Sequence, residues 1–182
     1  FNRVFEIGKS FRNEGIDRSH VQEFTSLEWY LAFADYQTNK HLFVSLINRI
    51  VHSVGFENGV VNRGDVKLDF FDIRTKKYRD LFEEYGLESP DTYSTKEADE
   101  LFKRVIRPNI IQPTFIDDYP AHMSPMAARK KNDPNTVEQW QLIVDGWEIV
   151  KCYTELVDPI IQRELLEQQA AERESGNDEA MM

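Results

Sequence analysis

The sequence predicts an α+β fold in which an antiparallel β-sheet is flanked by α-helices. Two hairpin patterns indicate the sheet, and two long helical patterns indicate the layers that cover it. The hairpins lie at residues 3–31 and 139–153, and the helical patterns at residues 35–54 and 159–173. No repeat or flexible linker interrupts this order, so we expect one domain over residues 1–182.

Apolar and polar residues alternate along the first hairpin with the period of two that a β-strand requires. Residues 3–12 place on one side Phe5, Ile7 and Phe11, and on the other Glu6, Gly8, Ser10 and Arg12. Residues 24–31 place on one side Thr25, Leu27, Trp29 and Leu31, and on the other Phe24, Ser26, Glu28 and Tyr30. We expect the apolar side to face a core and the polar side to face a ligand.

The polar side of this hairpin carries residue types that suit a nucleotide and a charged small molecule. Arg12 can hold a phosphate or a carboxylate through two parallel hydrogen bonds, and Phe24 can stack on a base. Gly8 and Ser10 are small and leave room above the sheet. The same pattern also fits an amphipathic hairpin whose charged side chains form ion pairs in solvent, and alternation by itself does not decide between the two.

Between the two hairpins the sequence predicts a helix packed on the sheet, followed by shorter elements. Within residues 35–54, the apolar residues at helical spacing are Leu42, Leu46, Ile50 and Val54, together with Phe43 and Ile47. The shorter elements are a strand at 66–71, a helix at 78–85 that ends at Gly86, a helix at 95–106 and a strand at 114–116. The segment from Ser94 to Glu97 resembles a capped start for the helix at 95–106, and Pro108 stops it.

A turn signal separates the strands of the second hairpin. The strands are expected at Gln139–Val144 and Trp147–Tyr153, joined by an Asp-Gly pair that is typical of a type I′ turn. A final helix is expected to begin after Asp158, whose side chain can cap it, and to run to about residue 173.

Composition narrows the class of protein. The net charge of −10 argues against a free-standing nucleic-acid-binding domain, whereas carboxylate-rich sites suit Mg²⁺ and a cationic amino acid. The single cysteine, Cys152, excludes an internal disulfide and is more typical of a small half-buried residue than of a reactive thiol. The sequence shows no apolar run as long as a membrane span and no signal peptide, so we expect a cytoplasmic protein without a membrane partner.

Several segments together resemble the lysyl-tRNA synthetases, a family of class II aminoacyl-tRNA synthetases. RVFEIGKSFRNEG and EFTSLEWY resemble the strand–loop–strand of motif 2, and QPTFIDDYPAHMSPMA and DGWEIVKCYTELVDP resemble later segments in the same order. The resemblance implies part of a class II synthetase catalytic core, without a separate anticodon-binding domain. It also implies a lysine–tRNA ligase that uses ATP and Mg²⁺ to form lysyl-adenylate, transfers lysine to tRNA(Lys), and is a homodimer at full length.

The resemblance also assigns roles to individual residues. Arg12 matches the catalytic motif 2 arginine, which contacts the ATP α-phosphate and the amino-acid carboxylate. The other ATP-binding matches are Glu14 on the adenine side, His20 near the outer phosphates, and Phe24, which stacks on adenine. The lysine-binding matches are Glu28, Tyr30 and Glu155, the last of which recognises the ammonium group. Glu148 matches a magnesium-binding carboxylate.

The chain departs from the family at Gln141 and Lys151, at Val157 in place of an asparagine, and at Val21-Gln22 in place of Asn-Pro. One spacing also needs an explanation. The family has a second magnesium-binding glutamate seven residues before Glu148, where this chain has Gln141, so the number of metal ions stays open. Lys151 stands where an asparagine contacts the bound lysine, and we expect its ammonium group to point away or to meet a carboxylate. A regular strand would place Glu148 and Glu155 on opposite faces, so a β-bulge or a local switch is needed to bring them together.

Two other functions fit these residues: a related enzyme that transfers lysine to a protein, and a non-catalytic module that keeps the nucleotide or lysine pocket. The family's motif 1 is expected before Phe1, and its motif 3, with a second ATP-binding arginine, after Met182. We therefore expect the isolated 182 residues to bind ATP weakly and to have little or no activity.

Overall fold

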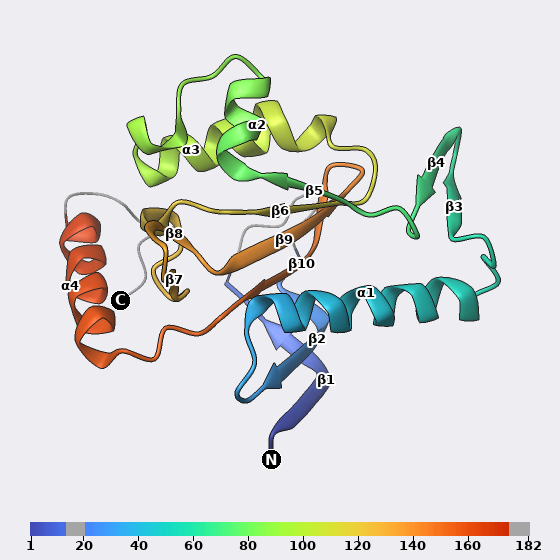
Figure 1. Cartoon of the computed structure of the whole chain (residues 1–182), viewed down its shortest axis with the longest axis horizontal. Coiled ribbons are helices and arrows are strands. Elements are labelled where there is room, and N and C mark those ends of the chain that lie inside the picture. Colours follow the sequence, from blue (N-terminus) through green and yellow to red (C-terminus); the bar gives the residue numbers. More distant parts are fainter. Residues whose placement is uncertain (14–20, 175–182) are drawn as a thin grey trace. The chain divides into compact units, whose positions relative to one another are not determined.

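A computed structural model describes residues 1–13 and 21–174, and Figure 1 shows their helices and strands. The chain forms two compact units, Phe1–Asp35 and the part that begins at Tyr36. The first unit is a β-hairpin, and the second contains a four-stranded sheet with helices on both faces. This content confirms the predicted α+β class with antiparallel strands.

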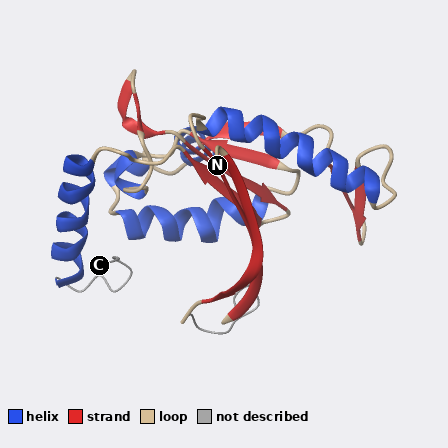
Figure 2. Cartoon of the chain, turned by 90° about the horizontal axis from the view of Figure 1, so that it is seen from below, coloured by secondary structure: helices blue, strands red, loops and turns tan. Residues whose placement is uncertain are grey.

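The first unit pairs β1 (Arg3–Phe11) with β2 (Glu23–Leu31) in the antiparallel arrangement that the alternation predicted. Figure 2 shows the two strands as a long curved ribbon. Ser10 lies opposite Phe24 in the register. The pairing continues past the end of β1, because the backbone N–H of Arg12 donates a 2.9 Å hydrogen bond to the residue before β2.

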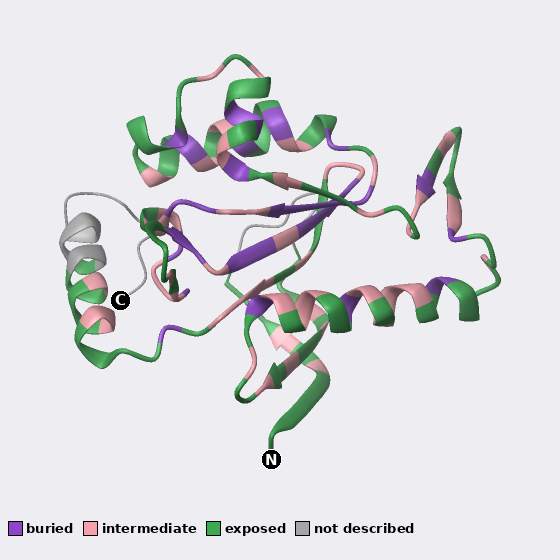
Figure 3. Ribbon diagram, in the orientation of Figure 1, coloured by how far each residue is buried: buried purple, intermediate pink, exposed green. Residues whose placement is uncertain are grey.

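The apolar side of this hairpin is exposed, so the expectation that it faces a core was wrong. Phe5 is 74% exposed, Ile7 66% and Phe11 73%, and Figure 3 shows most of β1 as exposed. Two paired strands form one layer only, and a second layer is needed to bury a face of that layer.

The sheet of the second unit has the strand order β10-β9-β6-β5. β9 (Gln139–Val144) and β10 (Trp147–Tyr153) form the predicted hairpin, and both central residues of its turn have the positive φ that type I′ requires, 49° and 75°. β6 (Thr114–Asp117) pairs antiparallel with β9, whereas β5 (Arg74–Lys77) pairs parallel with β6. β5 was not predicted, because its sequence RTKK has no apolar residue to show alternation.

One face of this sheet is covered by α1 (Tyr36–Ser53), which confirms the helix predicted at residues 35–54. Its buried side is that of Phe43 and Val51, whereas Leu42, Ile50 and Val54 of the predicted apolar row are 44%, 44% and 63% exposed. The ring of Phe43 packs against the rings of Phe115 and Trp140, with centroids 6.3 and 5.8 Å away. The indole Nε1 of Trp140 donates a 2.7 Å hydrogen bond to the carbonyl oxygen of Tyr36. The start of α1 is therefore fixed to the middle of the sheet.

The opposite face is covered by α2 (Tyr78–Glu84) and α3 (Thr95–Leu101). The main hydrophobic core lies here, and its buried members are Tyr78, Leu81, Phe82, Ala98, Phe102, Ile106, Ile110, Ile116, Tyr119, Ala127, Val137 and Ile143. α2 confirms the helix predicted at residues 78–85 and is followed by Gly86, whose φ is +68°.

α3 begins at the predicted cap, and the helical stretch that it starts continues to Ile106. Its capping box is complete, because the Ser94 side chain accepts from the backbone N–H of Glu97 while the Glu97 side chain accepts from the backbone N–H of Ser94. The helical stretch predicted to residue 106 is confirmed in its extent, but its last part is a π-helical turn (Phe102–Ile106), which a 3₁₀ turn (Arg107–Asn109) follows. Pro108, which cannot donate a backbone hydrogen bond, lies in the second of these turns.

Short elements complete the loops of the second unit. They are the ribbon of β3 (Val60–Arg63) and β4 (Val66–Asp69), the pair of β7 (Arg129–Lys130) and β8 (Asp133–Val137), and the 3₁₀ turns η1 (Pro90–Thr92) and η4 (Ala121–Met123). β4 corresponds to the strand predicted at 66–71.

The last helix, α4 (Pro159–Glu174), begins at the predicted cap. Oδ1 of Asp158 accepts hydrogen bonds of 2.9 and 3.3 Å from the backbone N–H groups of Ile160 and Ile161. Among the residues that the structure describes, no helix is both long enough and apolar enough to cross a membrane.

Candidate functional site

The polar side of the β1–β2 hairpin gathers residues predicted to bind a nucleotide. The guanidinium carbon of Arg12 lies 5.3 Å from the centroid of the Phe24 ring. Beside this pair, the hydroxyls of Ser10 and Ser26 share a 2.8 Å hydrogen bond, and Gly8 lies opposite Ser26. A cation over an aromatic ring, next to a floor of small residues, is a surface on which a base and a phosphate can be placed.

Carboxylates follow farther along the same side of the hairpin. Glu6 lies directly opposite Glu28, and the hydroxyl of Tyr30 donates a 3.4 Å hydrogen bond to Oε2 of Glu28. Two like charges in a cross-strand pair repel each other, and a cationic ligand between them relieves that repulsion. The predicted residues Glu14 and His20 lie outside the described residues.

A β-bulge at Ile149 brings two further predicted residues to one face of the four-stranded sheet. Glu148 pairs with Ile143 and Lys151 pairs with Gln141, and the register shifts between residues 148 and 150. Because residues 141 and 143 of β9 share a face, their partners on β10 share it too. Of the two alternatives that the spacing left open, a bulge or a local switch, the structure thus has the bulge.

Glu155 lies just beyond β10 and on this same face. The side chain of Thr154 turns toward α1, because its Oγ1 accepts a 2.9 Å hydrogen bond from the backbone N–H of Tyr36. Alternation along the extended chain then turns Glu155 the other way, where it forms an isolated β-bridge with Ala127. The face away from α1 thus carries Gln141, Glu148, Lys151 and Glu155.

Tyr119 orients the amide group of Gln141. The Tyr119 hydroxyl donates a 2.7 Å hydrogen bond to Oε1 of Gln141. Burial in the main core raises the pKa of this hydroxyl well above its ordinary value, so the group stays protonated and remains a donor. The sequence did not reveal Tyr119, because only the pairing of β6 with β9 brings it to a residue 22 positions away.

Lys151 adds a positive charge directly opposite Gln141. Crowding by protein atoms lowers the pKa of its ammonium group, Glu148 and Asp99 act to raise that pKa, and Lys103 acts to lower it. Within the described ranges Lys151 forms no direct ion pair, although these two carboxylates lie near enough to act on its charge. The expectation that Lys151 points away or meets a carboxylate therefore stays a prediction.

The groups around position 141 do not fit a divalent metal ion. Among residues 1–13 and 21–174, no three His, Cys, Asp or Glu side chains come together as a metal-binding group. The amide oxygen of Gln141 already accepts from Tyr119, and the residue directly opposite is the cation Lys151. Glu148 remains as a single carboxylate, which suits Mg²⁺ only together with other oxygens such as those of a phosphate chain.

The sequence of the chain is similar to known proteins over almost its whole length. The family described as tRNA synthetases class II (D, K and N) matches residues 1–181. The chain is 36% identical to a lysine–tRNA ligase of Aquifex aeolicus, 37% to one of Christiangramia forsetii and 36% to one of Porphyromonas gingivalis. Each alignment includes the whole chain and 34%, 36% and 35% of the relative, respectively, so the chain spans about a third of these curated relatives.

Proposed function

The chain belongs to the class II tRNA synthetases of the D, K and N group, and we propose that it is part of an enzyme that joins lysine to tRNA(Lys) with ATP. In the first step, a carboxylate oxygen of lysine bonds to the α-phosphorus of ATP while the bond to pyrophosphate breaks, which gives lysyl-adenylate. In the second step, the oxygen of a tRNA ribose hydroxyl bonds to the carbonyl carbon of the lysyl group, the bond from that carbon to the phosphate breaks, and AMP leaves while the hydroxyl proton is released. A homodimeric, cytoplasmic enzyme is part of the same proposal.

The observation that carries this proposal is the stacking of Arg12 over Phe24 on the polar side of the hairpin. We assign Phe24 to the adenine ring, which can stack on its face. We assign Arg12 to the α-phosphate and the lysine carboxylate, whose negative charges meet as the new bond forms. The main contribution of the protein is thus to place two anions together and to stabilise their combined charge.

The other predicted residues take supporting roles. Glu14 is proposed to bind on the adenine side and His20 near the outer phosphates. Glu28, Tyr30 and Glu155 are proposed for lysine, with Glu155 facing its ammonium group. A carboxylate left without its cation in a closed pocket would reject uncharged amino acids strongly.

Glu148 is the residue we assign to Mg²⁺. Bound there with the phosphate chain, the ion would supply positive charge to the phosphate oxygens. Because Gln141 and Lys151 do not suit a cation, we propose that Glu148 holds the only metal ion that β9 and β10 contribute.

Lysine-dependent exchange of pyrophosphate into ATP by the full-length protein tests this proposal. Arg12→Lys is expected to lower kcat about 100-fold or more, because lysine cannot bind two oxygens in parallel. Phe24→Leu is expected to raise KM for ATP about tenfold through lost stacking. Lys9→Met is the matched control, since Lys9 lies on the other side of β1 and pairs with Glu23 at 2.8 Å.

The acceptor is tested separately from activation. Transfer of labelled lysine to tRNA(Lys) is the expected result. Transfer to protein alone would show that the acceptor is a protein and not tRNA. No lysine-dependent exchange above background would overturn the ligase proposal as a whole.

A further inference from the structure

We propose that Gln141 and Lys151 form a binding pair for a phosphate group, and that this pair takes the place of a second metal ion. The inference rests on the proposed function for the identity of its ligand, the phosphate chain of ATP. The binding of a phosphate anion itself follows from the geometry of the pair and can be tested without catalysis.

The two residues lie directly opposite each other on β9 and β10. The side chains of such a cross-strand pair leave the sheet on the same face and lie about 5 Å apart at their Cβ atoms. A single phosphate group can therefore reach both side-chain ends. The sheet fixes the spacing of the pair, because β9 is paired on its other side with β6.

The hydrogen bond from Tyr119 decides which end of the Gln141 amide is available. Tyr119 donates to Oε1 and so fixes the amide with its other end, Nε2, left to serve a ligand as a donor. Within the described part of the chain Nε2 has no hydrogen-bond partner. It is not among the buried side-chain atoms that lack a partner, so a ligand can reach it. Gln141 thus presents a donor, which a metal ion cannot use and a phosphate oxygen can accept.

Lys151 supplies the charge. Its ammonium group has three donors and no acceptor, and it forms no ion pair among the described residues. The charged groups near it are Glu148, Asp99 and Lys103. The two carboxylates attract the ammonium group, but neither forms a direct ion pair with it. A positive charge there repels both a second metal ion and the ammonium group of lysine, whereas it attracts a phosphate.

A phosphate chain fits this pair better than the lysine carboxylate does. The carboxylate and the α-phosphate are already assigned to Arg12. The outer phosphates carry the larger charge, and a lysine side chain is a common point-charge partner for them. Tyr119 is a positioning residue in this arrangement, because it acts only through Gln141.

Binding of inorganic tripolyphosphate to the full-length protein, measured by calorimetry with a metal chelator present, tests the pair directly. We expect saturable binding without metal, and an affinity about tenfold lower in Lys151→Met. Gln141→Glu replaces the donor with a carboxylate and is expected to lose about as much. Tyr119→Phe frees the Gln141 amide to turn and is expected to lose less than either.

Lys103→Met is the matched control. It removes the same charge near the same place, but Lys103 is already paired with Asp99 at 2.5 Å. An equal loss of affinity in Lys103→Met and Lys151→Met would show that net charge governs binding, and the pair would be rejected. Absence of metal-free binding by the natural protein would also overturn it. Thermal unfolding of each variant checks that it is folded.

The Mg²⁺ dependence of ATP–pyrophosphate exchange separates this inference from the proposed function. Lys151→Met is expected to need several-fold more Mg²⁺ for half-maximal exchange, because a metal ion must then supply the missing charge. Exchange with unaltered Mg²⁺ dependence and unaltered tripolyphosphate affinity would reject the pair and leave the ligase function intact. The opposite outcome is also distinguishable. If the natural protein binds tripolyphosphate but shows no exchange activity, and Lys151→Met loses that binding, the pair is supported and the ligase function is rejected.

Discussion

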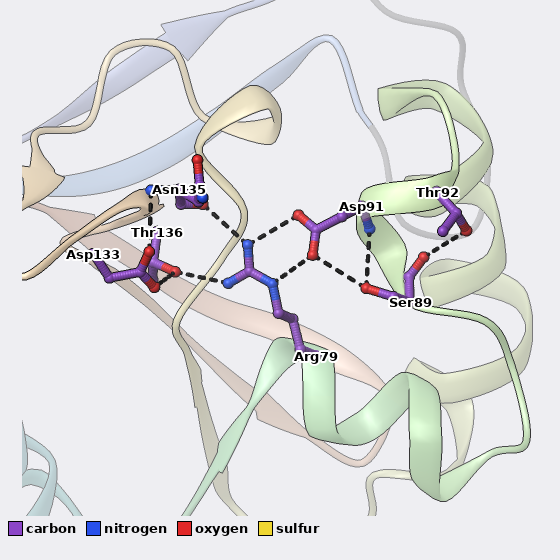
Figure 4. Close-up of polar contacts among 7 residues, drawn as sticks. All are labelled: Arg79, Ser89, Asp91, Thr92, Asp133, Asn135 and Thr136. Atoms are coloured by element: carbon purple, nitrogen blue, oxygen red, sulfur yellow. Dashed lines mark hydrogen bonds and ion pairs between the residues drawn. The ribbon is translucent and has the colours of Figure 1, made fainter.

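The guanidinium group of Arg79 holds the carboxylate of Asp91 through two hydrogen bonds, 2.6 Å from Nε to Oδ2 and 2.9 Å from Nη2 to Oδ1 (Figure 4). The same group donates to Oγ1 of Thr136 at 2.7 Å and to the carbonyl oxygen of Asn135 at 3.0 Å. A single side chain of α2 thus joins the η1 turn to β8.

Replacing Arg79 by lysine is expected to lower the free energy of unfolding by about 1–2 kcal/mol. A lysine keeps the charge but cannot serve four acceptors with a fixed planar group. Urea unfolding measures the change. Lys76→Met is the control, because Lys76 and Glu84 form a pair whose side chains are 38% and 53% exposed, and a change within about 0.5 kcal/mol is expected there. Equal effects of the two variants would contradict a special role for Arg79.

The same contact predicts how stability depends on pH. The hydrogen bond from Arg79 is the main cause that lowers the pKa of Asp91 below its ordinary value. A carboxyl group with a lowered pKa in the folded state contributes stability above its unfolded pKa and loses it as the pH falls through the folded pKa. We expect Asp91→Asn to be less sensitive to acid than the natural protein in unfolding curves measured from neutral pH into the acid range. An unchanged acid dependence would reject this assignment.

Lys40 and Asp117 form a second ion pair, at 3.6 Å, with side chains only 15% and 14% exposed. Burial is the main cause that lowers the pKa of Lys40 and raises that of Asp117, so both charged forms are disfavoured in the folded state. We expect Lys40→Met and Asp117→Leu each to destabilise the fold by about 2–4 kcal/mol, since each leaves one buried charge unpaired.

The double variant of this pair is expected to lie within about 1 kcal/mol of the natural protein, because it leaves no buried charge behind. Chemical unfolding of the single and double variants measures the coupling. Additive losses in the double variant would show that the two charges act independently.

Elements with strong local signals could be predicted from the sequence. The β9–β10 turn needs positive φ at two adjacent residues, and an Asp-Gly pair provides them cheaply. The starts of α3 and α4 each depend on one polar side chain that lies next to the helix in sequence, Ser94 and Asp158. The spacing of Glu148 and Glu155 left a bulge and a local switch in conformation as alternatives, and the structure has the bulge, at Ile149.

Features that depend on distant residues could not be predicted. β5 forms by pairing with the edge of β6. The sequence RTKK itself has no residue pattern that predicts a strand. The contact of Tyr119 with Gln141, and hence the orientation of the amide, depends on how β6 pairs with β9. The face of the sheet on which the Lys151 side chain lies likewise depends on its pairing with Gln141, which the bulge sets.

Trp140 has no exposed surface and is hydrogen-bonded to Tyr36, so it supports both the core and the start of α1. Trp140→Phe is expected to cost about 2–3 kcal/mol, from a small cavity and the loss of the buried indole hydrogen bond. Trp147→Phe is the control, because Trp147 is 42% exposed, and a change below about 0.5 kcal/mol is expected. Thermal or urea unfolding compares the two, and similar losses would contradict this account of the core.

Cys152 is expected to be a poorly reactive thiol in the folded protein. It lies opposite Trp140 in the β9–β10 register, and burial raises its pKa to about 12. The thiolate is the reactive form, so native alkylation by iodoacetamide near pH 8 should be at least about 100-fold slower than that of free glutathione in the same solution. Unfolding in urea restores an ordinary thiol pKa, and labelling followed by mass spectrometry should then become fast. Rapid labelling without denaturant would show that β10 opens at this position, because a thiol held against the sheet stays protonated until the pH approaches its raised pKa.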